Sequence, residues 1–264
     1  MRILCLHGRG SNNDIFKMQT AGFRSQLDDF EFEFVQGTVQ HAKEGWAIHT
    51  DTFANSGLWE YYDLLDPYNV IETEQELLQL VEDDGPYDGV LGYSQGASLA
   101  AQAIIRFAVE NPTATADQFP FRFAIFINCP TPIRILEMDE KVEPDIPKPE
   151  ESDAALYMML ARANPLLDSQ ALFPARLANG RRVLTDNTVG LTKADPALDG
   201  QLIKIPTLHI RCPEDKEQFG REAYELCEKS VARQCFHHHD HDFPRGYDEM
   251  RAIAKQIRSL AEGH

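Results

Sequence analysis

The stretch Gly89-Val90-Leu91-Gly92-Tyr93-Ser94-Gln95-Gly96-Ala97 decides the fold that we predict for this chain. Its centre, residues 92–96, matches the G-x-S-x-G pattern, in which a serine occupies a sharp turn between a strand and a helix. The apolar run 89–92 precedes this turn as a strand, and the Ala- and Ile-rich run 95–109 follows it as a helix. Such a turn holds the serine in a strained conformation and exposes its hydroxyl at the carboxyl edge of a sheet. The pattern predicts a serine nucleophile, with a chance match in a glycine-rich turn as the alternative.

The rest of the chain alternates short apolar runs with longer amphipathic ones. Strands are predicted at 3–6, 32–35, 89–92, 123–128, 207–210 and 234–236, and helices at 14–27, 72–81, 95–109, 217–227 and 247–260. This alternation is typical of β-α-β units, which build a parallel sheet with right-handed crossovers. We therefore predict a single α/β-hydrolase domain over residues 1–264, with about six parallel strands in the spatial order 2-1-3-4-5-6 and helices on both faces.

Two segments interrupt the alternation. Residues 131–205 are too long for one crossover; they open with acidic, proline-rich sequence and contain a helix-like run at 154–163. Long insertions in compact domains are usually functional, so we expect a cap or lid here rather than a second domain. Residues 46–68 carry five Trp and Tyr side chains without clear periodicity. These aromatic side chains are expected either to line an acyl pocket or to pack in the ordinary core.

The composition disfavours several classes of protein. The 264 residues are 43% hydrophobic and 25% charged, which is ordinary for globular proteins, and no apolar run approaches the roughly 18 residues of a membrane span. The net charge of −17 disfavours nucleic-acid binding, which depends on cationic contacts to phosphates. Five cysteines without a C-x-x-C pair indicate reduced thiols, and the first residues lack the apolar core of a signal peptide. We expect a cytoplasmic protein that binds neither membranes nor nucleic acid.

A serine nucleophile needs a base, and the base needs an acid that holds its tautomer. In chains with this turn the acid and then the base follow later in the sequence, each just after a strand. Asp215 lies in the loop after the strand at 207–210 and is the predicted acid. Glu214 and Glu217 are its rivals, and a solvated loop carboxylate or a helix N-cap is the ordinary alternative for any acid here.

The base is predicted in the loop after the strand at 234–236, where four of five consecutive residues are histidines. His241 stands deepest in this loop, just before the last helix, and completes the predicted catalytic set with Ser94 and Asp215. The other histidines of the loop are expected to be exposed (His237, His238 and His239). A metal site is the alternative, because His and Asp ligate zinc, but consecutive loop histidines have no fixed ligand spacing.

The oxyanion of an acyl-transfer reaction needs backbone N–H donors from two turns. We predict the N–H of Gln95, directly after the nucleophile, and the N–H of Arg9, in the turn after the first strand, with Gly10 as the rival of Arg9. The same turn raises a dinucleotide-binding alternative, because Gly8 and Gly10 follow a strand. The third glycine of that pattern is missing, since Asn13 occupies its place.

These motifs together resemble the FSH family of serine hydrolases, small α/β-hydrolases common in fungi. The resemblance covers nearly the whole chain outside the insertion. It rests on Arg2-Ile3-Leu4-Cys5-Leu6-His7-Gly8, on Gly85-Pro86-Tyr87-Asp88-Gly89 through Ala97, on Ile205-Pro206-Thr207-Leu208-His209-Ile210, and on His241-Asp242-Phe243-Pro244-Arg245. Carried over by position, the nucleophile, acid and base of the family fall on Ser94, Asp215 and His241.

The chain departs from the family pattern in two turns. Cys212 stands where the family usually has a glycine before its acid, and His239 and Asp240 stand where it usually has a glycine pair before its histidine. Bulkier residues restrict these turns, and Asp240 beside His241 would raise the pKa of the imidazole. The departures concern the geometry of the turns, since no catalytic group is lost.

The resemblance implies a carboxylesterase or thioesterase that needs no cofactor or metal. It also implies an acyl substrate, either a small molecule or a chain bound to a carrier protein or polyketide synthase of a secondary-metabolic pathway. Docking an acidic carrier protein to this acidic chain would need a local basic patch, for which Arg181, Arg182 and Arg245 are candidates. An acyltransferase or lactonase with the same triad is one alternative, and a small-molecule binding protein that has lost catalysis is another.

Overall fold

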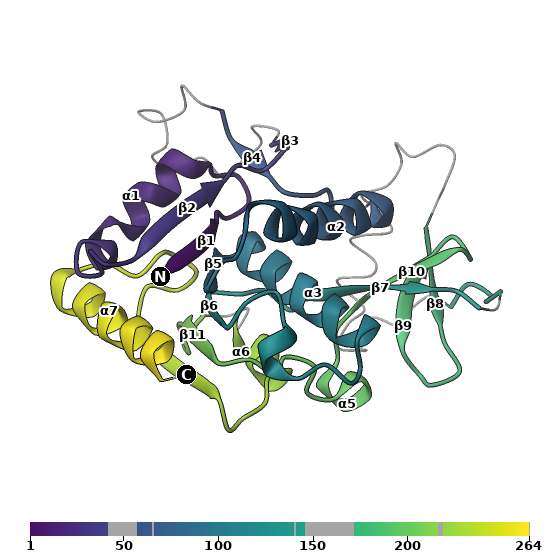
Figure 1. Ribbon diagram of the computed structural model, residues 1–264. Helices are drawn as coiled ribbons and strands as arrows, with labels where there is room; N and C mark the ends of the chain where they lie inside the picture. Colours follow the sequence, from purple (N-terminus) through teal and green to yellow (C-terminus); the bar gives the residue numbers. More distant parts are fainter. Residues whose placement is uncertain (42–56, 65, 140, 146–171, 216–218, 264) are drawn as a thin grey trace.

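The computed structural model describes residues 1–41, 57–64, 66–139, 141–145, 172–215 and 219–263, and the account below concerns these parts of the chain (Figure 1). Six parallel strands form the central sheet, in the spatial order β12-β11-β6-β5-β1-β2. The strands are β1 (Arg2–Leu6), β2 (Glu31–Val35), β5 (Gly89–Tyr93), β6 (Phe123–Ile127), β11 (Thr207–Arg211) and β12 (Ala232–Phe236). The predicted α/β-hydrolase fold and the predicted strand order are both confirmed.

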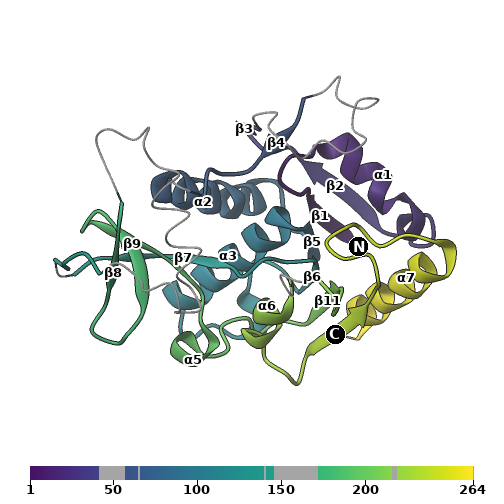
Figure 2. The same cartoon turned by 180° about the vertical axis from the view of Figure 1, so that it is seen from behind.

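Helices cover both faces of this sheet. Helices α1 (Asn13–Arg24) and α7 (Tyr247–Glu262) pack together on one face, and α2 (Pro67–Asp84) and α3 (Gln95–Glu110) pack together on the other (Figures 1 and 2). Shorter helices complete the described elements: the 3-10 turn Ala116–Gln118, α5 (Pro196–Asp199) and α6 (Arg221–Glu225). The layered arrangement leaves the carboxyl ends of the parallel strands at one shared edge, where a site can form.

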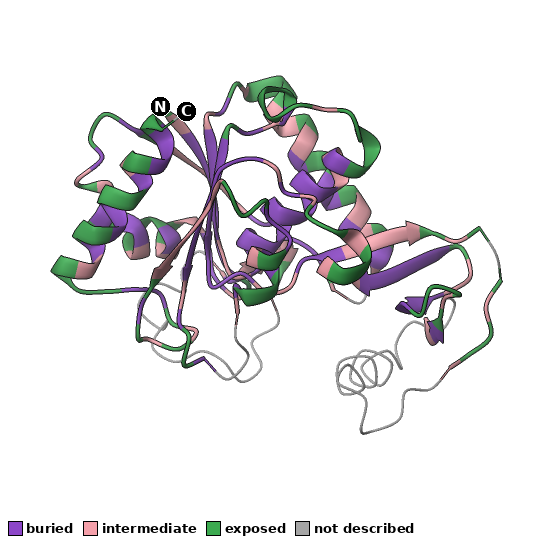
Figure 3. Ribbon diagram, turned by 90° about the horizontal axis from the view of Figure 1, so that it is seen from below, coloured by how far each residue is buried: buried purple, intermediate pink, exposed green. Residues whose placement is uncertain are grey.

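Alternation along the strands explains why both faces are covered. In β1, Ile3 and Cys5 pack with α1 and α7, whereas Leu4 and Leu6 pack with α2 and α3, and all four are fully buried. Successive strand side chains point to opposite faces, so a strand that is apolar at every position needs a helix layer on each side. Figure 3 shows the resulting line of buried strands between two helix layers that are exposed on their outer sides.

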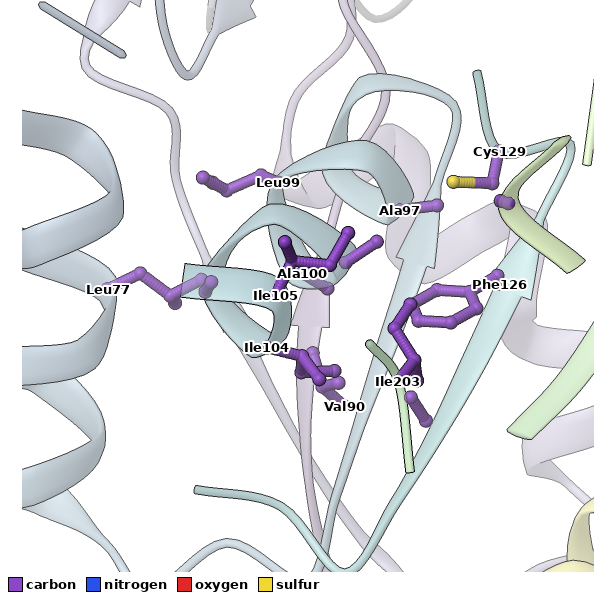
Figure 4. Close-up of a cluster of buried hydrophobic side chains, with 14 of the residues drawn as sticks. Leu77, Val90, Ala97, Leu99, Ala100, Ile104, Ile105, Phe126, Cys129 and Ile203 are labelled. Carbon is purple, nitrogen blue, oxygen red and sulfur yellow. The ribbon is translucent and has the colours of Figure 1, made fainter. Parts of the chain in front are cut away.

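The core beneath α3 depends on its small residues. Ala97 and Ala100 let the helix lie close to the sheet, where Ile104 lies beside Val90 (Figure 4). Close packing of this kind buries apolar surface worth about 25 cal/mol per Å². It therefore fixes the start of α3, and with it the turn that carries Ser94.

Three helices differ from the lengths that we predicted. Helix α2 begins at Pro67 rather than at residue 72, because the Asp66 side chain caps it by accepting hydrogen bonds from two backbone N–H groups. Helix α1 ends at Arg24 instead of residue 27. Helix α6 spans only five residues, whereas a helix over 217–227 was predicted; residues 216–218 lie outside the described parts.

The insertion after β6 contains a second, antiparallel sheet in the order β7-β10-β9-β8. Its strands are β7 (Ile133–Glu137), β8 (Phe173–Arg176), β9 (Arg182–Thr185) and β10 (Val189–Lys193), and a separate short ribbon pairs β3 (Val39–Gln40) with β4 (Trp59–Glu60). The second sheet contacts α2 and α3, on the side of the molecule that Figure 1 shows in green. The helix predicted at 154–163 lies outside the described residues. Within the described parts, no helix is long and apolar enough to cross a membrane.

Two buried histidines make the stability of the fold depend on pH. Burial lowers the pKa of His209 on β11 to about 3 and the pKa of His7 after β1 to about 4. Between these values and about 6.5, the unfolded chain binds a proton on each imidazole and the folded chain does not. The free energy of unfolding is therefore unaffected by these two groups above the unfolded pKa of about 6.5, and it decreases as the pH falls below that value.

We expect the free energy of unfolding to fall by about 2 kcal/mol per buried histidine between pH 7.5 and pH 5. Urea unfolding at the two pH values measures this loss. His209→Gln removes one of the two groups, so its loss between the two pH values should be smaller than that of the unsubstituted protein. Identical pH dependence in the two proteins would contradict the assignment.

Candidate active site

Ser94 stands between β5 and α3 in a backbone conformation that few L-residues adopt, with φ of 50° and ψ of −118°. Its backbone N–H donates to the carbonyl of Ile127 over 2.9 Å, which ties the turn to β6. A Cβ on Gly92 would clash with the backbone of Ala97, and a Cβ on Gly96 would clash with carbonyl oxygens at the end of β1. The glycines are thus needed for close approach, and the turn matches the strand–turn–helix geometry predicted from the sequence.

The His241 imidazole meets the Ser94 hydroxyl. Nε2 of His241 lies 3.0 Å from Oγ of Ser94, a hydrogen-bonding distance. The ring lies between Tyr93, with centroids 5.9 Å apart, and Phe219, with centroids 4.3 Å apart. Burial lowers the pKa of His241, although Asp215 and Asp242 act to raise it. The imidazole is therefore neutral near pH 7, with Nε2 free to accept a proton.

The expected effect of Asp240 on this pKa is wrong, because the net shift is downward and Asp240 is not among the groups that act on the ring. Asp240 does occupy the left-handed region, with φ of 48°. Aspartate tolerates this region better than most residues, which explains how the turn forms without the glycine that the family usually has there.

Asp215 lies behind the imidazole. Its Oδ2 is 3.8 Å from Nδ1 of His241, within ion-pair range but longer than a hydrogen bond, and its side chain is 7% exposed. Its rival Glu214 points elsewhere: it is 58% exposed and contacts His238 and the Cys212 thiol. The structure therefore brings Asp215, and not Glu214, to His241. Glu217 lies outside the described residues.

The turn after β1 directs the N–H of Arg9 away from His7. Nε2 of His7 accepts the Gly37 N–H over 3.0 Å, so Nδ1 carries the proton and donates to the Gly8 carbonyl over 2.8 Å. In a trans peptide the C=O and N–H point in opposite directions. The Arg9 N–H of that same peptide therefore points away from the imidazole of His7.

The two predicted oxyanion donors lie on neighbouring turns. Gly8 lies so close to the turn that carries Ser94 that a Cβ on Gly8 would be 3.4 Å from Cβ of Ser94. Within the described parts of the chain, the N–H groups of Arg9 and Gln95 have no hydrogen-bond acceptor. The rival Gly10 N–H already donates to the carbonyl of Trp59 over 3.0 Å. Arg9 and Gln95 are thus the pair that remains available to a ligand.

The side chains of the other three loop histidines contact three different residues. His238 is exposed, as predicted, and contacts Glu214, whereas His239 is half-buried and contacts Glu249 on α7. The prediction that His237 is exposed is wrong: this side chain is fully buried, and its Nε2 lies 2.9 Å from Oδ1 of Asn128. Among the described residues, no three His, Cys, Asp or Glu side chains converge as metal ligands.

The predicted basic patch is wrong for two of its three residues. Arg181 and Arg182 are 6% and 7% exposed, and Arg181 forms an ion pair with the buried Asp199. They hold the insertion together and cannot meet a partner protein. Arg245 is exposed near the end of the histidine loop, where it pairs with Asp242 over 3.5 Å.

Two tyrosines of the aromatic segment also belong to the core. Tyr61 donates to the carbonyl of Val35 and accepts the N–H of His7, and Tyr62 accepts a hydrogen bond from Gln102. Both are nearly fully buried. Tyr61 supports the turn after β1, Tyr62 packs against α3, and Trp46 lies outside the described residues.

Asn128 and Phe219 contact the base loop and were missed by the sequence analysis. A signal existed for Asn128, because it is a polar residue directly after a buried strand that neighbours the strand of Ser94. The carboxyl ends of adjacent parallel strands share an edge, so such a residue is a candidate for the site. Phe219 carried no comparable signal.

Comparison with known proteins identifies the family of this chain. A family model described as Serine hydrolase (FSH1) matches residues 1–253. Esterase FPY3 of Fusarium mangiferae is 36% identical over 276 residues, which cover 100% of each chain. Hydrolase FUB4 of Gibberella moniliformis is 27% identical over 281 residues, which cover 97% of each chain. An uncharacterized protein of Bacillus cereus with a solved structure shares the fold alone, with a TM-score of 0.50 at 12% identity over 100% of this chain and 60% of that one.

Proposed function

This chain belongs to the FSH1 family of serine hydrolases and acts on ester bonds, and from the geometry above we propose that Ser94, His241 and Asp215 are its catalytic triad. The observation that carries the proposal is the 3.0 Å contact between Oγ of Ser94 and Nε2 of His241 at a strained strand–helix turn. A serine hydroxyl is a weak nucleophile until an adjacent base takes its proton, and this contact supplies the base.

The first step forms an acyl-enzyme. His241 takes the proton of Ser94 on Nε2 as Oγ attacks the acyl carbonyl, and the carbonyl oxygen becomes an oxyanion. The N–H groups of Arg9 and Gln95 bind this oxyanion, each worth about 3 kcal/mol of transition-state stabilisation. The tetrahedral intermediate then collapses, and His241 returns the proton to the departing alcohol or thiol.

The second step releases the acyl group. Water gives a proton to His241 and attacks the acyl-enzyme, and the second intermediate expels Ser94, which recovers the proton. Asp215 stabilises the imidazolium in both steps and holds the imidazole tautomer with the proton on Nδ1. Besides the substrate and this water, the proposed steps use side chains and backbone groups of the chain.

The proposed substrate is a carboxylic ester or thioester of a medium or large acyl group, such as a polyketide chain in fungal secondary metabolism. The names of two fungal relatives, an esterase and a hydrolase, support the ester part of this proposal. A small-molecule substrate is favoured over a carrier-bound one, because Arg181 and Arg182 are buried. Five free cysteines support a cytoplasmic setting with reduced thiols.

Two measurements test the proposal. Mass spectrometry after treatment with a fluorophosphonate probe should place one label on the peptide that carries Ser94. Paired p-nitrophenyl esters and N-acetylcysteamine thioesters with the same acyl chain then show which leaving group the enzyme prefers. A label on another residue, or turnover without any label, would contradict the proposed nucleophile.

The pH profile reports the state of His241. Since burial lowers the pKa of this imidazole, log(kcat/KM) should be flat near neutral pH and should fall with unit slope below a midpoint under about 6.5. Asp242→Asn should move the midpoint further down, because the Asp242 carboxylate acts to raise this pKa. Asp248→Asn is the matched control and should leave it in place. A midpoint above pH 7 would contradict the neutral base.

A further inference from the structure

Asn128 connects the strand beside the nucleophile to the loop that carries the base. It follows β6 directly, is fully buried, and adopts the left-handed region with φ of 45°. Its N–H donates to the carbonyl of Ile210 over 2.9 Å, while the preceding residue, Ile127, accepts the N–H of Ser94. The backbone of Asn128 is therefore fixed to β11 on one side and lies one residue from the contact that holds the nucleophile turn.

The Asn128 side chain holds the backbone of the base loop. Its Nδ2 lies 3.0 Å from the carbonyl oxygen of His241 and 3.0 Å from that of Asp242. The Tyr93 hydroxyl donates to the same His241 carbonyl over 2.8 Å. Carbonyl oxygens only accept, so the amide must present its NH₂ group to them. Three hydrogen bonds thus converge on the peptide groups on the carboxyl side of His241.

His237 favours the same orientation of that amide. Nδ1 of His237 lies 3.3 Å from the backbone N–H of His239, which can only donate to it. The proton of this imidazole therefore lies on Nε2, which donates over 2.9 Å to Oδ1 of Asn128. Burial lowers the pKa of His237, which favours its neutral form. His237 and the two carbonyl groups thus agree on one amide orientation.

The imidazole of His241 depends on this support because its own contacts are few. Among the described residues, its ring meets Oγ of Ser94 over 3.0 Å, Oδ2 of Asp215 over 3.8 Å and the two flanking aromatic rings. The 3.8 Å separation is too long for a hydrogen bond that would fix the orientation of the ring. The position of the ring therefore depends on the backbone that carries it and on the two flanking aromatic rings.

We propose that Asn128, oriented by His237, is a positioning residue that places the His241 imidazole against Ser94, an inference that rests on the proposed function of His241 as the base. The amide holds the carbonyl groups on one side of His241, and packing against Tyr93 and Phe219 holds the ring. Groups that orient a functional histidine through hydrogen bonds are worth about 10- to 100-fold in activity, and misplacement by about 1 Å lowers rates by about 100-fold.

Asn128→Asp tests the amide with almost no change in shape. It replaces the Nδ2 donor with a carboxylate oxygen. An ionised carboxylate cannot donate to the two carbonyl oxygens of the loop, so both hydrogen bonds are lost. We expect kcat and the rate of fluorophosphonate labelling to fall together by about 100-fold, with KM changed by less than about threefold. A role confined to stability would lower the melting temperature and leave kcat per folded molecule unchanged.

A pair of substitutions at His237 tests the orientation of the amide. His237→Gln retains an N–H donor near the position of Nε2, whereas His237→Leu removes it. We expect His237→Leu to lower kcat by about 10-fold and His237→Gln to recover most of that loss. His238→Leu, at the exposed neighbour, is the matched control and should retain full activity.

The outcomes separate this inference from the proposed function. If the unsubstituted enzyme labels on Ser94 and folded Asn128→Asp labels equally fast, the positioning role is wrong and the triad stands. If Asn128→Asp does not fold, the His237 pair decides, and equal kcat in His237→Gln and His237→Leu overturns the inference. If the unsubstituted enzyme does not label at all, the proposed function fails, and the positioning role fails with it.

Discussion

Ser94→Ala should abolish covalent labelling by a fluorophosphonate probe and lower kcat/KM for an ester by about 10,000-fold or more. The substitution removes the only atom that attacks the acyl carbonyl, while the oxyanion donors at Arg9 and Gln95 remain. Alanine must adopt the same strained backbone conformation, with φ of 50°, so the turn itself should persist. Gel fluorescence of the labelled protein and initial rates with a p-nitrophenyl ester measure the two effects.

Ser98→Ala is the matched control for this prediction. Ser98 lies one turn further along α3, is 3% exposed, and accepts a hydrogen bond from Gln102. It faces the core and has no contact with His241 among the described residues, so its removal should leave labelling intact. Continued labelling of Ser94→Ala, or loss of labelling in the Ser98 control alone, would assign the nucleophile to a different residue.

The predictable part of this fold is the part that local sequence determines. The turn at Ser94 is specified by glycines that only close backbone approach requires, and the strands are specified by runs that are apolar at every position. Strand order then follows from right-handed crossovers and from the place of the nucleophile turn. Asp215 and His241 could be placed because each follows a strand whose carboxyl end must lie at the edge that Ser94 occupies.

The unpredicted part depends on contacts between residues far apart in the sequence. From the sequence, His237 is expected to be an exposed loop histidine. It is buried, and Oδ1 of Asn128, 109 residues away, accepts a hydrogen bond from its Nε2–H. Arg181 and Arg182 resemble a basic patch in the sequence, yet both are buried, and Arg181 forms an ion pair with the buried Asp199. No local pattern identifies such partners, because polar residues are buried wherever the tertiary fold supplies the matching group.

Asp240, in the loop that carries His241, shows how a turn can form without its usual glycine. Asp240 takes the left-handed conformation that a glycine would adopt without strain. A bulkier residue at position 240 restricts this turn, but two other contacts hold it. The Asp242 N–H donates to the carbonyl of His239 over 2.9 Å, and Phe243 packs against Tyr93 with ring centroids 5.3 Å apart. The turn is thus held from both ends, and the position of His241 is preserved.

Asp215→Asn should lower kcat by about 100- to 10,000-fold and leave KM nearly unchanged. The substitution keeps the shape of the side chain and removes the charge that stabilises the imidazolium formed in each step. An asparagine can also present its NH₂ group to Nδ1 of His241, which would favour the tautomer with the proton on Nε2, where no proton can be accepted from Ser94. Steady-state kinetics on the purified variant measure the change, and the lowered kcat should be accompanied by slower labelling of Ser94.

Glu214→Gln is the matched control, since this residue also carries a carboxylate and is adjacent in sequence. Its side chain is 58% exposed and contacts His238 rather than His241, so kcat should change by less than about twofold, within the range of exposed charge pairs. A large loss in Glu214→Gln together with a small loss in Asp215→Asn would assign the acid to Glu214. That result would require the loop after β11 to rearrange in solution, because of these two described carboxylates Asp215 is the one that is buried and 3.8 Å from the imidazole.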